Sequence, residues 1–279
     1  MIVFPHCKIN LGLRVLSKRP DGYHNIETVF YPLNWQEGLE LIQESAIMPS
    51  SRTADEVHLS SSGLSIPGST TDNICVKAYY ALKKDFSGLP PVKVHLHKTI
   101  PTGAGLGGGS SNGAFTLMLL NRKFNLGLTS EQLLHYALSL GSDCPFFILN
   151  QPCYATGRGE VLSPVPLQLN DFSFLIVYPA ISIQTAWAFS TIVPSQPSKP
   201  VNKIVQQPIA SWRHELENDF EPVVFGKYPE IGIIKKRLYE HGALYASLTG
   251  TGSSVYGIFT KNTLPEIEWD SRYIQKKII

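Results

Sequence analysis

A glycine-rich segment at residues 101–112 limits what this chain can fold into more than any other part of its sequence. The segment follows an alternating apolar and polar run at 92–97 and precedes a helical pattern at 110–120, with Ser110 or Ser111 as the expected N-cap. Glycine lets the backbone adopt positive φ and approach a ligand closely. A helix that begins directly afterwards adds unpaired N–H groups and a positive dipole end. The segment therefore predicts a loop that wraps nucleotide phosphates.

Two familiar glycine motifs do not fit this loop. Gly103-x-Gly105-x-x-Gly108 matches the dinucleotide-binding pattern, but that pattern also needs an acidic residue about 20 positions later. No Asp or Glu occurs between Asp85 and Glu131. A Walker loop ends in Gly-Lys-Ser/Thr, whereas this one ends in Gly-Ser-Ser-Asn. What remains is a phosphate loop that uses backbone amides and serine hydroxyls, with its cation supplied from elsewhere in the chain.

The bulk composition excludes several classes of protein. The 279 residues are 43% hydrophobic and 16% charged, which is typical of one large domain or two closely joined ones. A net charge of +2 argues against a nucleic-acid partner. No apolar run approaches the roughly 18 residues of a membrane span, and the first residues lack the features of a signal peptide. We therefore expect a soluble cytoplasmic protein with no membrane partner.

Neither the cysteines nor the histidines form a metal-binding pattern. The four cysteines show no CxxC or related spacing, so a reduced compartment and small buried thiols are expected. His6, His95 and His97 are expected to be ordinary polar positions on strand faces. The sequence predicts no protein-held metal site.

Strands and helices mix in both halves of the chain without strict βαβ alternation, which predicts the α+β class. Residues 2–16 alternate as a strand, with Lys8 and Asn10 on its polar face. Thr129 and Gln132 form a capping-box pattern for a helix that runs to Leu140. Further expected elements are a turn at 18–22, strands at 28–33, 174–178, from 245 and at 254–259, and a helix at 231–241. The turn-rich residues 151–159 mark the expected boundary between the halves.

The glycine-rich segment resembles the phosphate loop of the GHMP kinases, whose pattern is Pro-x-x-x-Gly-Leu-Gly-Ser/Gly-Ser-Ser. The resemblance covers nearly the whole chain. The motifs that carry it are Pro5-x-x-Lys8-Ile-Asn10-Leu-x-Leu13, Arg19-x-Asp21-Gly-Tyr-His24, Gly141-x-Asp143-x-Pro145, Ala155-x-Gly157-x-Gly159-Glu160, Ile181-Ser-Ile-x-Thr185, Asn218-Asp219 and Leu248-Thr-Gly-Thr-Gly-Ser253. The Asp-Gly-Tyr-His element is similar to that of the members acting on 4-diphosphocytidyl-2-C-methyl-D-erythritol.

This resemblance implies a fold, a reaction and partners. The fold would be two-lobed α+β, with an N-terminal ribosomal-protein-S5-domain-2-like lobe and a C-terminal ferredoxin-like lobe. The domains would be an ATP-binding domain at 1–155 and a C-terminal domain at 156–279. The reaction would be phosphorylation of the substrate's 2-hydroxyl in the non-mevalonate isoprenoid pathway, with ATP as donor and Mg²⁺ bridging its phosphates. The protein would be a monomer or a weak homodimer.

The resemblance also implies roles for individual residues. Asp143 would accept the proton of the 2-hydroxyl, or chiefly position that hydroxyl, while Lys8 orients it and offsets charge. Tyr23 would stack on the cytosine, His24 would hydrogen-bond its edge and Phe189 would cover its other face, whereas Asn10 and Thr185 would line the erythritol-phosphate side. The expected ATP-binding residues are Pro101, Thr102, Gly103, Ala104, Gly105, Leu106, Gly107, Gly108, Gly109, Ser110 and Ser111, with Asn73 and Lys98 at the adenosine end.

Two other classes stay open on the sequence. A nicotinamide oxidoreductase would bind a dinucleotide and transfer a hydride. A non-catalytic nucleotide-binding protein would bind without turnover, although Lys8 and Asp143 argue against this class because a decayed kinase typically loses such groups.

Overall fold

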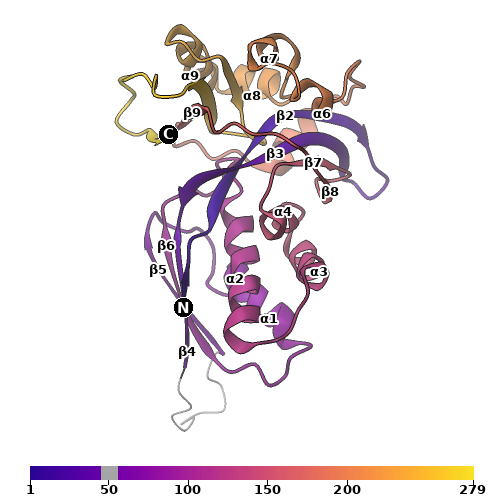
Figure 1. Ribbon diagram of the computed structural model, residues 1–279, viewed down its shortest axis with the longest axis vertical. Helices are drawn as coiled ribbons and strands as arrows, with labels where there is room; N and C mark the ends of the chain where they lie inside the picture. The colour runs from indigo at the N-terminus through magenta and orange to yellow at the C-terminus, as the bar shows by residue number, and fades with distance from the viewer. Residues whose placement is uncertain (45–55) are drawn as a thin grey trace. The chain divides into compact units, whose positions relative to one another are not determined.

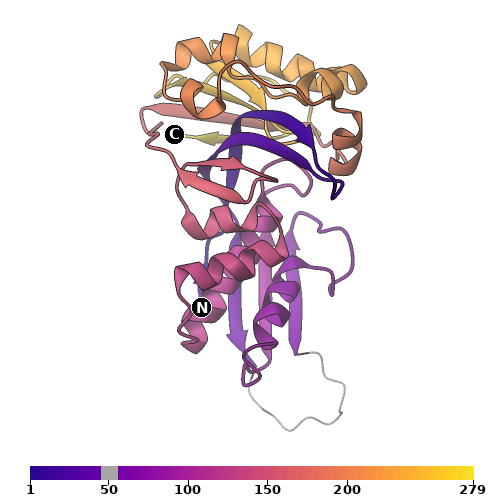
Figure 2. The ribbon, with the colours of Figure 1, turned by 90° about the vertical axis from the view of Figure 1, so that its right-hand side faces the viewer.

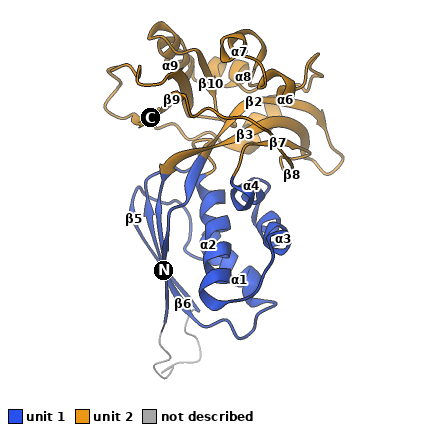
Figure 3. Ribbon diagram, viewed as in Figure 1, with its two compact units in different colours: residues 1–7, 36–102, 108–150 blue, residues 8–35, 103–107, 151–279 orange. Residues whose placement is uncertain are grey.

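The computed structural model describes residues 1–44 and 56–279, which fall into two compact units (Figure 3). Unit 1 comprises residues 1–7, 36–102 and 108–150, and unit 2 comprises 8–35, 103–107 and 151–279. The domains expected at 1–155 and 156–279 are contiguous, whereas these units are not. The sequence did not predict that residues 8–35 and 103–107 belong to unit 2. Contacts in space define the units, and such contacts cannot be read from the order of residues along the chain.

Unit 1 contains a four-stranded sheet with helices on one face (Figures 1 and 2). The strand order is β1-β4-β6-β5, in which β4 pairs with β6 antiparallel and β5 with β6 parallel. Helices α1 and α2 contact the sheet, and α3 and α4 pack on α2. The elements are β1 (Ile2–Val3), β4 (Gly38–Gln43), β5 (Val57–Gly63), β6 (Val92–Lys98), α1 (Ile74–Lys83), α2 (Gly108–Phe124), α3 (Ser130–Leu140) and α4 (Cys144–Leu149).

Two helix starts in unit 1 test the capping predictions. Helix α3 is preceded by a complete capping box, in which Thr129 Oγ1 accepts from the Gln132 amide and the Gln132 side chain accepts from the Thr129 amide, as predicted. The prediction for α2 was wrong, because this helix begins at Gly108. Ser110 and Ser111 therefore lie inside its first turn and do not cap it. The first N–H groups of a helix have no partner within it and can bind a ligand or water in place of a serine cap.

Unit 2 contains two further four-stranded sheets, ordered β2-β3-β7-β8 and β10-β11-β9-β12. Helix α9 packs on β10 and β11, and α7 packs on β10. The elements are β2 (His6–Lys18), β3 (His24–Gln36), β7 (Cys153–Thr156), β8 (Val161–Pro164), β9 (Phe172–Tyr178), β10 (Tyr245–Leu248), β11 (Val255–Thr260), β12 (Ile274–Ile278), α5 (Thr185–Thr191), α6 (Val201–Ile204), α7 (Ile209–Glu215), α8 (Glu221–Lys227) and α9 (Pro229–Glu240). This mixture of strands and helices confirms the α+β class.

Strand β2 is buried on both faces along most of its length. The predicted alternation is present, with Ile9 and Leu11 fully buried. However, the polar side chains between them are also inside, since Lys8 is only 3% exposed and Asn10 only 2%. Lys8 is therefore not an edge lysine in solvent. A charge in this position needs partners, because an unpaired buried ion is strongly unfavourable.

All four cysteines are free and buried, as the sequence predicted. Burial raises the pKa of the Cys144 thiol to about 12 and those of Cys75 and Cys153 to about 11. These three side chains stay protonated at neutral pH and act as small apolar groups.

A buried ion pair connects β6 to the residue that precedes β4. Lys98 Nζ donates to Glu37 Oε1 at a distance of 2.5 Å, and both side chains are at most 3% exposed. The same oxygen accepts from the Ile100 amide at 2.9 Å. The pair thus fixes the chain just before the glycine-rich segment.

Replacing Glu37 with glutamine should destabilise the protein strongly. The variant leaves the Lys98 ammonium buried without its carboxylate, which costs about 3–5 kcal/mol of unfolding free energy. Urea denaturation measures this loss. The control is Glu44→Gln, whose partner Lys93 is 59% exposed; its expected cost is below about 1 kcal/mol. Equal midpoints for the two variants would contradict a structural role for the buried pair.

Candidate functional site

The centre of the candidate site in unit 2 is the side chain of Lys8. Its Nζ donates to Asn10 Oδ1 at 2.5 Å and lies 4.9 Å from the centre of the Phe30 ring. The Lys8 backbone amide donates to the carbonyl of Leu106 at 2.9 Å. The predicted catalytic lysine therefore belongs to a strand that is hydrogen-bonded directly to the glycine-rich loop.

Asn10 is held by its backbone and by its side chain. Its amide donates to Thr249 Oγ1 at 3.1 Å, and its carbonyl accepts from the Tyr256 hydroxyl at 2.8 Å. Burial raises the pKa of Tyr256 well above 10, so this hydroxyl keeps the proton it donates. The Asn10 Nδ2 group donates to Thr28 Oγ1 at 3.0 Å. Asn10 is thus fixed at three points besides its contact with Lys8.

The first part of the glycine-rich loop packs very closely against the segment 249–254. Gly103, Gly105 and Gly107 all have positive φ, between 68° and 78°. A Cβ atom on Gly105 would stand only 2.0 Å from the Thr249 carbonyl oxygen. The Thr249 hydroxyl donates to the Gly105 carbonyl at 3.0 Å. Only glycine allows this approach, so the loop conformation is set by backbone contact.

Asn218 holds the other side of the segment 249–254. Its Nδ2 donates to the carbonyls of Leu248 and Gly250, each at 2.9 Å, and its Oδ1 accepts from the Phe220 amide at 3.0 Å. Asn218 belongs to the Asn-Asp motif noted in the sequence, and it lies beside β2, where residue 218 bridges Leu13. Its position explains why an amide side chain is useful there, since it satisfies two carbonyls and one amide at once.

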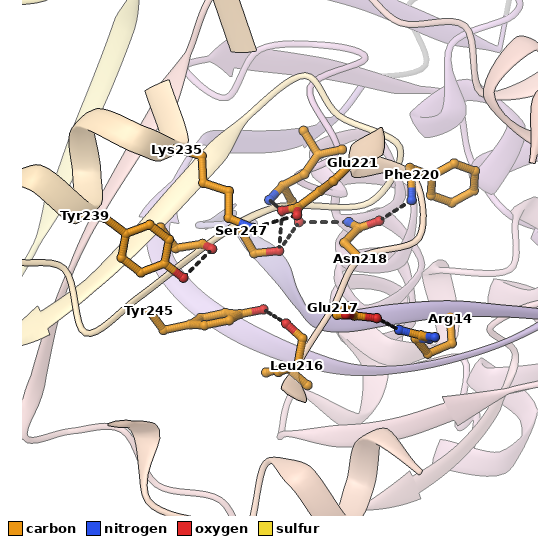
Figure 4. A network of polar contacts seen from close by, with 12 residues as sticks. Arg14, Leu216, Glu217, Asn218, Phe220, Glu221, Lys235, Tyr239, Tyr245 and Ser247 are labelled. Atoms are coloured by element: carbon orange, nitrogen blue, oxygen red, sulfur yellow. Dashed lines mark hydrogen bonds and ion pairs between the residues drawn. The ribbon is translucent and has the colours of Figure 1, made fainter. Parts of the chain in front are cut away.

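Glu221 anchors the end of β10 in the same network (Figure 4). Its Oε1 accepts from the Leu248 amide at 2.9 Å and from Ser247 Oγ at 3.1 Å, and its Oε2 accepts from Lys235 at 2.6 Å. Asn218 and Glu221 therefore grip both backbone groups of Leu248, immediately before Thr249. The segment 249–254, which contacts the glycine-rich loop, is therefore held by hydrogen bonds at its beginning.

Unit 1 carries the second part of the glycine-rich segment as the start of α2. A Cβ atom on Gly108 would stand 3.1 Å from both Lys98 Nζ and Ile100 Cγ2. The Oγ of Ser111 and the Oδ1 of Asn112 are buried and have no hydrogen-bond partner among residues 1–44 and 56–279. The Ser111 hydroxyl can donate to an anionic ligand at this helix start, whereas the Asn112 oxygen can only accept.

Asp143 lies in unit 1, in the turn between α3 and α4. It occupies the N-cap position of α4 with φ −83° and ψ −15°, but its carboxylate makes no capping hydrogen bond. The turn is closed instead by the Cys144 amide, which donates to the Gly141 carbonyl at 3.1 Å. A structural capping role does not account for this aspartate. Its predicted partnership with Lys8 stays a prediction.

The two residues predicted for the adenosine end both have structural partners within unit 1. Asn73 is the N-cap of α1, where its side chain accepts from the Cys75 amide at 2.9 Å. Lys98 is paired with Glu37, although its Nζ lies close to Gly108. Neither contact tests nucleotide binding, so this assignment also stays a prediction.

The residues predicted to bind the cytidine lie in unit 2. His24 stacks on Phe189 with ring centres 5.2 Å apart and an interplanar angle of 27°. Burial lowers the pKa of His24, with a smaller effect from Lys18, so its imidazole is neutral at pH 7. Tyr23 is 56% exposed, and the Arg158 guanidinium lies 4.9 Å from its ring centre. Thr185 Oγ1 lies 3.5 Å from Thr251 Oγ1. The cluster thus offers an exposed aromatic face and a neutral imidazole.

Sequence reasoning missed several residues that shape these contacts, namely Thr28, Glu37, Arg158 and Tyr256. Thr28 lies within an apolar strand pattern, and Tyr256 is far from Asn10 along the chain, so neither carries a local signal. Among the described residues, no group of three or more His, Cys, Asp or Glu side chains could hold a metal ion. No helix of the described chain is long and apolar enough to cross a membrane.

Comparisons with known proteins agree with this arrangement. Residues 73–151 match the GHMP kinases N-terminal domain, and residues 203–268 match the GHMP kinases C-terminal domain. The chain is 48% identical over 270 residues to the 4-diphosphocytidyl-2-C-methyl-D-erythritol kinase of Bacteroides thetaiotaomicron, covering 96% of both chains.

Solved structures give the same result for the fold. A crystal structure of 4-(cytidine 5'-diphospho)-2C-methyl-D-erythritol kinase superposes with a TM-score of 0.77 at 28% identity, covering 92% of this chain and 90% of the other. The homoserine kinase of Cytophaga hutchinsonii has a TM-score of 0.66 at 16% identity, covering 94% and 85%, and shows the fold alone. The two-lobed fold predicted from the sequence is confirmed, and the chain belongs to the 4-diphosphocytidyl-2-C-methyl-D-erythritol kinase family of the GHMP kinases.

Proposed function

We propose that this chain transfers the γ-phosphoryl group of ATP to the 2-hydroxyl of 4-diphosphocytidyl-2-C-methyl-D-erythritol, a step of the non-mevalonate isoprenoid pathway. The observation that carries the proposal is the direct hydrogen bond between Lys8 on β2 and Leu106 of the glycine-rich loop. This bond joins the strand that carries the buried Lys8 to a loop whose glycines suit phosphate binding. The family relatives, which are named for this kinase, support the choice of substrate.

The glycine-rich loop and the first turn of α2 bind the phosphates of ATP in this proposal. Backbone amides at positive-φ glycines and at the start of α2 donate to phosphate oxygens, and the buried Ser111 hydroxyl adds a further donor. In this proposal Mg²⁺ would be held mainly through the phosphates of the nucleotide. When bound, Mg²⁺ neutralises phosphate charge.

The proposed chemistry needs one carboxylate and one cation. Asp143 accepts the proton of the 2-hydroxyl as that oxygen attacks the γ-phosphorus, and the bond to the β–γ bridging oxygen breaks to release ADP. Lys8 offsets the negative charge and orients the hydroxyl, while its own position is fixed by Asn10. Catalysis of this kind depends chiefly on positioning and electrostatic stabilisation.

The aromatic cluster in unit 2 is proposed to recognise the cytosine. Tyr23 offers its exposed ring for stacking, and the neutral His24 can hydrogen-bond the edge of the base. The stacking of Phe189 on His24 keeps the imidazole in place, and Thr185 lies on the side proposed for the erythritol phosphate.

Replacing Asp143 with asparagine, or Lys8 with alanine, should lower kcat by about 10²–10⁴-fold, because each change removes charge from the reacting centre. Coupled measurement of ADP release with the cytidine substrate reports the rate. Asp171→Asn, at an exposed position before β9, is the matched control and should retain normal turnover. Near-normal activity in either site variant, with an unchanged thermal midpoint, would refute the assigned role.

The alanine variants of Gly105 and Gly109 should behave differently. Gly105→Ala forces a Cβ into the Thr249 carbonyl at φ 78°, so we expect a destabilisation of about 1–3 kcal/mol and at least a tenfold loss of ATP affinity. At Gly109 an added Cβ meets no atom within 4 Å. Because alanine favours the helix, the Gly109 variant should fold with equal or higher thermal stability. Thermal unfolding and calorimetric ATP titration measure both effects, and equal behaviour of the two variants would contradict the close-approach argument.

The substrate assignment is tested by Tyr23→Ala. Loss of base stacking should raise KM for the cytidine substrate by about 5–100-fold and leave KM for ATP within about twofold. Tyr80→Ala, at an exposed position on α1, is the control. Turnover of homoserine or mevalonate by the unaltered protein, without turnover of the cytidine substrate, would instead place the activity in a sister family.

A further inference from the structure

Thr28 lies in the middle of β3, is fully buried and has no part in the chemistry proposed above. We propose that Thr28 is a positioning residue for phosphoryl transfer, because its hydroxyl determines which end of the Asn10 amide faces Lys8. This inference rests on the proposed function for its catalytic consequence. The positioning itself concerns only residues of unit 2 and can be measured without turnover.

The orientation of the Asn10 amide matters because its two ends have nearly the same shape but opposite hydrogen-bonding character. With Oδ1 toward Lys8, the amide accepts from the ammonium, as observed at 2.5 Å. With the amide reversed, two N–H donors would face an ammonium that has only donors. In a site where Lys8 is 3% exposed, water cannot easily compensate for that reversal. Something in the site must therefore select the first orientation.

Thr28 makes this selection by using its only proton elsewhere. Its hydroxyl donates to the Gly12 carbonyl, and the same oxygen lies 3.0 Å from Asn10 Nδ2. A threonine hydroxyl has one proton, so once that proton is given to Gly12 the oxygen can only accept. The group that faces it must be the NH₂ end of Asn10. The chain of hydrogen bonds therefore runs from Lys8 to Asn10 to Thr28 to Gly12, each donating to the next.

Gly12 is a fixed end for this chain because its backbone cannot easily change. It has φ 64° within β2, a conformation that favours glycine. A Cβ atom at this position would stand 2.6 Å from Leu216 Cδ1. The acceptor at the end of the chain is a main-chain carbonyl whose position is set by the fold and does not depend on a side-chain rotamer.

Thr249 does not make this selection. Its hydroxyl lies 3.3 Å from Asn10 Oδ1, but it donates its one proton to the Gly105 carbonyl at 3.0 Å. The Lys8 ammonium and the accepting oxygen of Thr28 therefore set the direction of the amide between them. A reversed amide would lose the contact with Lys8 and would face the accepting oxygen of Thr28 with a second acceptor.

The first test compares two substitutions that separate the hydroxyl from the shape of the side chain. Thr28→Val keeps the branched shape and removes the hydroxyl, whereas Thr28→Ser keeps the hydroxyl and removes a methyl group. We expect Thr28→Val to lower kcat by about 10–100-fold with KM for ATP within about twofold. Thr28→Ser should stay within about threefold of the parent. Equal loss in both variants would assign Thr28 to packing and overturn the proposal.

A double-mutant cycle with Asn10→Asp asks whether Thr28 acts through Asn10. The two oxygens of an aspartate are equivalent, so this side chain needs no orienting partner. In the Asn10→Asp background, Thr28→Val should therefore change kcat by less than about threefold, which makes the two substitutions non-additive. The same fold-loss in both backgrounds would show that Thr28 does not act on the amide.

A spectroscopic measurement separates this proposal from the proposed function. In ¹H–¹⁵N spectra, the Asn10 side-chain NH₂ signals are identified by their loss in Asn10→Asp. They should exchange slowly with solvent in the parent and in Thr28→Ser, and at least tenfold faster in Thr28→Val. Unchanged exchange in Thr28→Val would overturn the proposal. If the parent shows this pattern but does not turn over the cytidine substrate, the proposed function fails and the positioning by Thr28 stands.

Discussion

The contact between Gly105 and Thr249 is the constraint on which the site in unit 2 depends. Gly105 can lie this close to the Thr249 carbonyl only because glycine has no Cβ atom. The close approach leaves the Thr249 side chain between the loop and Asn10, in contact with both. One hydroxyl then accepts from the Asn10 amide and donates to the loop. The geometry of the phosphate loop and that of the strand carrying Lys8 are therefore coupled through a single side chain, and neither can shift without the other.

This coupling is stable because the polar groups around Asn10 and Leu248 have partners. Burying an amide, a hydroxyl and an ammonium is unfavourable unless each finds hydrogen bonds. Asn10 has partners for its backbone amide, its carbonyl and both ends of its side chain. Asn218 and Glu221 do the same for the residues that precede Thr249. The cost of a polar interior is offset by a network that also makes the arrangement specific.

Sequence patterns predicted those features of the fold that depend only on residues close together along the chain. Alternation located β2, and the Thr129–Gln132 pair located the start of α3, because both signals lie within one element. The start of α2 was misplaced, since serines next to glycines resemble a cap when the backbone cannot be seen. The burial of Lys8 and the role of Thr28 depend on contacts across strands, which alternation cannot reveal. The grouping of residues 8–35 with the C-terminal half has the same cause.

The absence of a lysine within the glycine-rich loop also has a structural explanation. A Walker loop carries its cation in its own sequence, at the end of the loop. Here the cation belongs to Lys8 on β2. The hydrogen bond from the Lys8 backbone amide to the Leu106 carbonyl fixes this part of the strand relative to the loop. Because the lysine belongs to a buried strand, its ammonium has little freedom to follow a ligand, and its direction is set by Asn10. A lysine held in this way moves less than a lysine in a loop, and its ammonium keeps a fixed orientation. A fixed orientation suits a reaction whose rate depends on where charge is placed.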